Sequence, residues 1–264
     1  MNKKHFVLGG DIKKSLTEGY RFDFKSLFKD AFVITKKHYF PLITACLFTI
    51  IILAGCYSLI LDSSSFDETG VLDGSAFDET GNMLINYIIA LLIAPPLLTG
   101  LQMMGVNHAI GLKTKSIDLF NYVKIIMKLS LATMIISLIT NIISVLLTQT
   151  MGDWGMKLSI VVLLYLNMAF CLVYPLIAEK KMPAQMALRV SFKLVNKNLA
   201  QFTILFILLA LLFILALLPS GLGLFLFVPF YFNLMGIVYR QTCGVGVVAL
   251  ELPDNDQHSD EFEA

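Results

Sequence analysis

The sequence predicts an all-α fold, namely a polytopic membrane helix bundle with six transmembrane helices in three hairpins, each preceded by a cytoplasmic amphipathic helix. Three observations predict it. The chain is 57% apolar and only 15% charged, whereas soluble domains average about 45–50% and about 25%. Its apolar residues gather in runs of membrane-spanning length, and its cations fall almost entirely on alternate connections between those runs.

Each predicted span is an apolar run long enough to cross a bilayer. Crossing about 30 Å of hydrocarbon requires about 20 residues at about 1.5 Å per residue. Only the short break at 219–221 separates the last two runs, so they must form a hairpin. The six predicted spans are about 41–61, 83–106, 129–147, 158–178, 202–218 and 222–239.

The cations predict the orientation of these spans. Of the 20 Lys and Arg residues, 19 fall in segments on one side of the membrane, and Lys157 alone falls on the other. The positive-inside rule assigns the cation-rich side to the cytoplasm. We therefore expect a cytoplasmic N-terminal segment at 1–39, a membrane domain at 40–248 and an acidic tail at 249–264, with both termini cytoplasmic.

The first external loop repeats the sequence Phe-Asp-Glu-Thr-Gly, at 66–70 and at 77–81. Acidic turns can bind calcium, but this spacing lacks the alternating oxygen ligands and the closing glutamate of a calcium loop. Loops tolerate insertions at small cost. We therefore favour a solvated linker that was lengthened by duplication.

The cytoplasmic segments before the first, third and fifth spans combine basic residues with an apolar helical face. Such a pattern is typical of a short helix that lies at a membrane surface. The apolar faces comprise Leu27, Phe28, Ala31, Phe32 and Thr35 in the first segment, Ile117, Phe120, Val123 and either Ile126 or Met127 in the second, and Met186, Val190, Leu194 and Leu199 in the third.

Neutral polar residues form ordered faces within the predicted spans. The candidate polar face comprises Thr133, Ser137, Thr140, Asn141 and Ser144 on the third span, Asn167 on the fourth, and Asn233 and Arg240 on the sixth. One interpretation is a packing seam in which the three asparagines act as interhelical clasps and Arg240 reaches lipid phosphates. The other is a hydrated groove for a small solute or a lipid headgroup.

The ionisable residues offer no recognisable chemistry. No Asp, Glu, Lys, Arg or His lies near the centre of a predicted span, which weighs against ion-coupled transport. The four cysteines and four histidines are scattered without ligand spacing, so we expect no metal and no cofactor. The absence of any hydrolase or metalloprotease motif also predicts that the chain is not an enzyme.

One stretch resembles a known family. The sequence of 174–202 has a proline ending a span, an acidic-basic pair and a short break before a helix, at Pro175, Glu179, Lys180 and Pro183, followed by Ala187, Ser191, Leu194 and Asn198. These features resemble the YciC-like family of uncharacterised bacterial inner-membrane proteins, which is loosely similar to the membrane domain of some glycerophosphodiester phosphodiesterases. Those enzymes carry their catalysis in a separate soluble barrel, so the resemblance implies a fold and a bacterial inner membrane. It does not explain residues 1–23.

Two functions are compatible with these features. The first is a non-enzymatic membrane component whose partners are membrane phospholipids, further copies of itself or other membrane proteins. The alternative is a facilitator or transporter of a small solute or lipid, with the polar face of the third span as its path. The net charge of +1 reflects a segregated cation distribution, and we expect no nucleic-acid partner.

Overall fold

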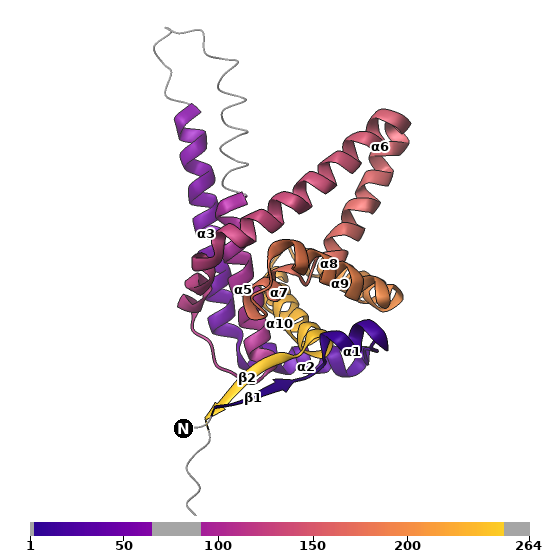
Figure 1. The fold of residues 1–264 in the computed structure, drawn as a ribbon. Coiled ribbons are helices and arrows are strands. Elements are labelled where there is room, and N and C mark those ends of the chain that lie inside the picture. Colours follow the sequence, from indigo (N-terminus) through magenta and orange to yellow (C-terminus); the bar gives the residue numbers. More distant parts are fainter. Residues whose placement is uncertain (1–2, 65–90, 251–264) are drawn as a thin grey trace, which may run out of the picture.

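The computed structural model describes residues 3–64 and 91–250, and most of them are helical. The prediction of a helical fold is thereby confirmed, with one addition, a pair of short strands (Figure 1). The elements are β1 (Lys3–Leu8), α1 (Ile12–Thr17), α2 (Phe24–Lys37), α3 (Tyr39–Ser64), α5 (Ala94–Ala109), the 3-10 helix η1 (Ser116–Ile125), α6 (Ile126–Ala169), α7 (Val173–Glu179), α8 (Ala184–Lys197), α9 (Leu199–Leu217), α10 (Leu224–Cys243) and β2 (Val245–Leu250).

Three helical stretches of the described chain are long and apolar enough to cross a membrane. They are Tyr39–Cys56, Ser116–Glu179 and Leu199–Leu217. The second contains 64 residues, far more than the about 20 that one crossing requires. Within it, α6 departs from helical geometry at Gly152, where φ is 54° and ψ is −129°. The helix leaves the body of the molecule, turns and comes back toward α8 (Figure 1).

The centre of the molecule is the crossing of α5 and α10. A Cβ atom added at Gly236 would overlap the carbonyl oxygen of Gly105, and one added at Gly105 would overlap the carbonyl oxygen of Phe232. The two backbones therefore touch directly. Such contact is characteristic of helices packed in lipid, where small residues let backbones approach because no hydrophobic force drives association.

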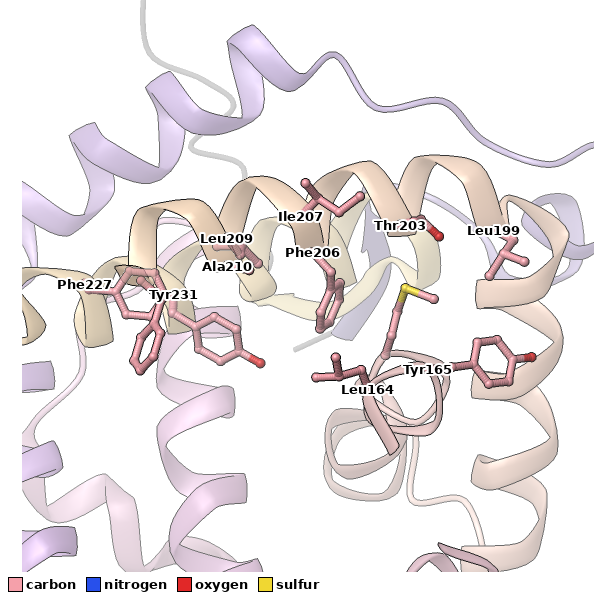
Figure 2. A pocket seen from close by; sticks show the side chains of 12 residues that line it. Leu164, Tyr165, Leu199, Thr203, Phe206, Ile207, Leu209, Ala210, Phe227 and Tyr231 are labelled. Atoms are coloured by element: carbon pink, nitrogen blue, oxygen red, sulfur yellow. The ribbon is translucent and has the colours of Figure 1, made fainter. Parts of the chain in front are cut away.

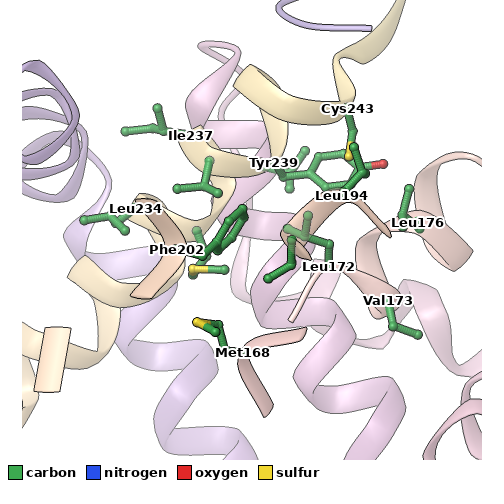
Figure 3. Close-up of a cluster of buried hydrophobic side chains, with 14 of the residues drawn as sticks. Met168, Leu172, Val173, Leu176, Leu194, Phe202, Leu234, Ile237, Tyr239 and Cys243 are labelled. Carbon is green, nitrogen blue, oxygen red and sulfur yellow. The ribbon is translucent and has the colours of Figure 1, made fainter. Parts of the chain in front are cut away.

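A large cluster of buried apolar side chains surrounds this crossing. Phe202 of α9 and Tyr239 of α10 are fully buried there, next to Leu172 and Leu194 from the α6–α8 region (Figure 3). A smaller cluster joins α3 to α5 through Leu42, Leu101 and neighbouring side chains. Helices far apart in the sequence thus share one core.

The two strands were not predicted. β1 and β2 pair in antiparallel register, with Lys3 opposite Leu250 and Leu8 opposite Val245. The chain turns onto β2 at Gly244, whose φ of 64° favours glycine. Because β2 reaches Leu250, the first two residues of the predicted tail belong to a strand. The remainder of the tail and the external repeat lie outside the described residues.

The amphipathic segments differ from expectation in detail. α2 buries Leu27, Ala31 and Thr35 and packs on α10, while its Phe32 is 66% exposed. The second segment is the 3-10 helix η1 rather than an α-helix. In α8 the buried face includes Ala187, Ser191 and Leu194, whereas Met186 is exposed. Tertiary packing on α6 and α7 selects this face of α8.

Candidate functional site

An apolar groove lies between α9, α10 and the part of α6 that follows Gly152 (Figure 2). Its volume is about 550 Å³. Phe206 of α9 points across it toward Leu164 of α6 (Figure 2). The lining residues are Leu164, Tyr165 and Met168 of α6, Leu199, Thr203, Phe206, Ile207, Leu209, Ala210 and Phe213 of α9, and Phe227 and Tyr231 of α10.

The composition of α9 explains why this groove is open. The helix contains almost only apolar side chains, yet it buries only Phe202, Leu205 and Leu209. Its groove side carries the small side chains of Thr203 and Ala210 about two turns apart, which leaves space against α6. Ile207 is 61% exposed and Leu164 is 65% exposed. Large apolar side chains therefore border the groove on an unburied face.

A polar cavity adjoins the groove at the beginning of α9. Its volume is about 810 Å³, and it shares Leu199 with the apolar groove. Tyr165, which lines the groove, donates its hydroxyl to Asn196 Oδ1 of the cavity at 2.8 Å. The remaining lining residues come from the N-terminal segment and the α8–α9 junction, namely Glu18, Gly19, Tyr20, Arg21, Lys197, Asn198, Ala200 and Gln201.

The N-terminal segment is held against this junction by specific hydrogen bonds. The Tyr20 hydroxyl donates to the Leu194 carbonyl at 2.6 Å, and Asn198 Nδ2 donates to the Tyr20 carbonyl. The Phe22 backbone N–H donates to Gln201 Oε1 at 2.8 Å, and the rings of Phe22 and Phe202 pack edge to face with centroids 5.6 Å apart. Burial raises the pKa of Tyr20, so the phenol remains a neutral donor.

A second polar feature is a buried cluster around His108, close to the α5–α10 crossing. His108 Nδ1 lies 2.8 Å from Asn233 Oδ1, and His108 Nε2 lies 2.7 Å from the Thr114 hydroxyl. Asn233 Nδ2 in turn donates to the Thr35 hydroxyl at 3.0 Å. Side chains from α2, α5, α10 and the connection after α5 thereby meet in one network.

His38 stacks on this cluster. Its ring lies parallel to that of His108, with centroids 4.3 Å apart, and both rings are buried. Burial and, to a smaller extent, neighbouring His38 lower the pKa of His108 to about 4, although the Asn233 hydrogen bond acts in the opposite direction. Burial, Lys37 and Lys113 lower the pKa of His38. Near neutral pH both rings are therefore uncharged, and Nδ1–H donates to Asn233 while Nε2 accepts from Thr114.

The predicted polar face of the third span is spread along α6 rather than gathered at either site. Thr133 Oγ1 lies 3.0 Å from the Tyr174 hydroxyl, a contact between α6 and α7. Thr140 donates to the Ile136 carbonyl, and Asn141 donates to the carbonyl of Ser137. The Thr148 hydroxyl donates to the carbonyl of Ser144. Most of these groups thus bond within their own helix.

The other predicted residues have separate environments. Asn233 is fully buried and bonds to α2 and α5, whereas Asn167 is exposed and bonds to the Leu163 carbonyl of its own helix. Arg240 donates to the Ala109 carbonyl at the end of α5. Its own carbonyl accepts from the Gly10 N–H at 2.9 Å, so Arg240 joins α5 to the N-terminal segment.

Sequence reasoning missed the histidine pair and the N-terminal contribution to the cavity. His38 and His108 are 70 positions apart, so no spacing rule brings them together. Tyr20 and Arg21 meet α8 and α9 only through tertiary contacts. The signal that was available is the unexplained segment 1–23, whose aromatic residues have no place in a plain linker.

Comparison with protein-family models, with curated proteins and with solved structures finds no match to this chain. The candidate sites therefore rest on their geometry alone.

Proposed function

We propose that this chain is a non-enzymatic component of a bacterial inner membrane that binds a phospholipid acyl chain in the groove between α6, α9 and α10. The observation that carries the proposal is the groove itself, a cavity of about 550 Å³ with apolar walls and exposed apolar borders. A soluble ligand would gain little from such walls, whereas an acyl chain is chemically matched to them.

The dimensions of the groove suit a chain that enters from one leaflet. Its lining residues extend along α9 from Leu199 to Phe213, which is about 21 Å at about 1.5 Å per residue. One leaflet contributes about half of the about 30 Å hydrocarbon thickness. If α9 crosses the bilayer, as its length and apolar sequence favour, the groove is long enough to hold an acyl chain over the depth of one leaflet.

We also infer six spans with both termini in the cytoplasm. Three features support this topology beyond the cation distribution. α6 reverses at Gly152, α9 and α10 are joined by a short turn, and β1 pairs with β2. Pairing of the first and last described elements requires both to lie on the same side of a membrane, which an even number of crossings provides.

The groove can be tested by filling it. The full chain is purified in detergent, mixed with phospholipid and examined by native mass spectrometry, with bound lipid counted for each variant. Ala210→Trp places an indole in the groove and is expected to lower lipid occupancy several-fold. Leu211→Trp is the matched control, because Leu211 does not line the groove and is 55% exposed. Equal occupancy in wild type and both variants would refute the proposal.

The polar face of α6 is less favoured as a solute path. Thr140, Asn141 and Thr148 already donate to carbonyls of their own helix. The donors of these three side chains therefore already have partners and need neither water nor a solute.

A further inference from the structure

We propose that the polar cavity beside Arg21 and Lys197 binds the headgroup of an anionic phospholipid whose acyl chain occupies the apolar groove. This inference rests on the proposed function and adds the ligand class to it. It also assigns a role to the N-terminal segment, which supplies one wall of the cavity.

The first argument is that the two cavities adjoin. They share Leu199, and the hydrogen bond from Tyr165 to Asn196 joins the wall of one to the wall of the other. The groove is apolar, and the neighbouring cavity is lined by amide, guanidinium and ammonium groups and by one carboxylate. A ligand that fills both must be amphiphilic.

The second argument is charge. Arg21 and Lys197 line the polar cavity, and Lys193 lines an adjoining hollow that shares Lys197 with it. Within the described residues no carboxylate lies within ion-pair distance of these three cations. Glu18 is the one acidic residue of the cavity wall, and its carboxylate lies 3.8 Å from Lys14 Nζ. The balance of charge favours a phosphate group.

The third argument is that the backbone carrying Arg21 is already fixed. Gly19 has a φ of 78°, and Tyr20 and Phe22 on either side of Arg21 are hydrogen-bonded to α8 and α9. A Cβ atom at Gly19 would approach Asn198 Oδ1 at 3.3 Å, which shows how closely this turn fits the junction. Arg21 can therefore meet a ligand without ordering its backbone, which favours binding.

The test compares two lipids that differ in headgroup charge. The purified full chain is offered equal amounts of phosphatidylglycerol, which is anionic, and phosphatidylcholine, which is zwitterionic, and bound lipid is counted by native mass spectrometry. We expect wild type to prefer phosphatidylglycerol about tenfold, because cations near an anionic lipid phosphate each add a few-fold. The Arg21→Gln/Lys197→Gln variant is expected to bind both lipids equally.

Three controls make the outcome specific. Lys13→Gln/Lys124→Gln removes two exposed cations that do not line the cavity, and it should keep the tenfold preference. Ala210→Trp should lose both lipids. Glycerol 1-phosphate carries the phosphate without an acyl chain, so a lipid site should resist displacement by it.

The other possible results distinguish the headgroup site from the acyl-chain groove. If Ala210→Trp loses lipid while Arg21→Gln/Lys197→Gln keeps the full preference, the headgroup site is wrong and the acyl groove stands. If neither variant changes lipid binding, both proposals fail. If glycerol 1-phosphate displaces the bound lipid as effectively as added phosphatidylglycerol does, the cavity binds a soluble phosphate compound and the lipid assignment is overturned.

Discussion

α9 and α10 are neighbouring helices, and the more apolar of the two, α9, is by far the less buried. From Phe232 to Tyr239 every residue of α10 is buried, whereas α9 buries only three of its 19 residues. The difference lies in a few non-apolar positions. α10 carries Asn233 and Gly236 at its contacts with α2 and α5, and α9 has no such pair.

This contrast shows which residues hold helices together in a lipid environment. Apolar side chains gain little by moving from lipid to protein, so association depends on close backbone packing and interhelical hydrogen bonds. Gly236 provides the first at the α5–α10 crossing, and Asn233 provides the second. α9 lacks both, and its apolar surface stays largely unburied, as the proposed acyl-chain site requires.

The largest loss of stability is expected from a substitution that forces the α5 and α10 backbones apart. In Gly236→Leu the new side chain must overlap the Gly105 carbonyl, so we expect a loss of more than about 3 kcal/mol of unfolding free energy. The thermal midpoint in detergent measures it. Gly55→Ala in α3 is the control, because a Cβ there meets nothing within 4 Å. Comparable midpoints for the two variants would contradict direct backbone contact.

Acid should weaken the same region through His108. Its pKa is near 6.5 when unfolded and about 4 in the structure, so between these values the unfolded state binds more protons. The stabilisation is complete above about pH 6.5 and is lost as the pH falls toward 4, by about 3 kcal/mol in total. His38 contributes with the same sign.

Thermal midpoints measured from pH 7.5 to 4.5 test this expectation. His108→Gln should flatten the pH dependence while lowering the midpoint at neutral pH. A variant that retained the full wild-type pH dependence would show that His108 is not its source.

Removing the Asn233 amide should have a smaller effect. Asn233→Leu leaves His108 Nδ1 and the Thr35 hydroxyl without their partner, and we expect a loss of about 2 kcal/mol. Asn141→Leu, which removes an exposed bond within one helix, should stay within about 0.5 kcal/mol of wild type. A smaller loss for Asn233→Leu than for Asn141→Leu would invert the proposed roles.

Cysteine labelling tests whether water reaches the polar face of α6, and the substitutions that it needs are not expected to change stability. In a background without native cysteines, Ser137→Cys and Ser144→Cys should not react with a water-soluble maleimide from either side of the membrane. Asp153→Cys, next to the turn at Gly152, should react from the extracytoplasmic side. Reaction at Ser137 or Ser144 would revive the hydrated path.

The helices were predictable from the sequence because their signals are local. Apolar runs of sufficient length predicted α3, α6 and α9, and the polar periodicity singled out Asn233. The sequence could not show which apolar helix would be buried, because α9 is the more apolar of the last two and is the less buried. Burial depends on the match between Gly236 and Gly105, 131 positions apart.

The candidate sites were harder to predict than the helices. The N-terminal segment has no apolar run, and its role follows from tertiary hydrogen bonds of Tyr20 and Phe22 with α8 and α9. The groove is a space between helices that each have an ordinary apolar sequence. Neither feature leaves a periodic signal along the chain.

The most direct test of the central claim is photo-crosslinking in native-like bilayers with a phospholipid that carries a diazirine in its acyl chain. Crosslinked peptides are mapped in wild type and in Ala210→Trp. We predict labelling concentrated on the groove walls at 164–168 and 199–213 that is lost in Ala210→Trp, while the exposed α3 face at Ile50 and Ile51 is labelled equally in both. Labelling of the groove no stronger than that of α3, and unchanged by Ala210→Trp, would contradict the account.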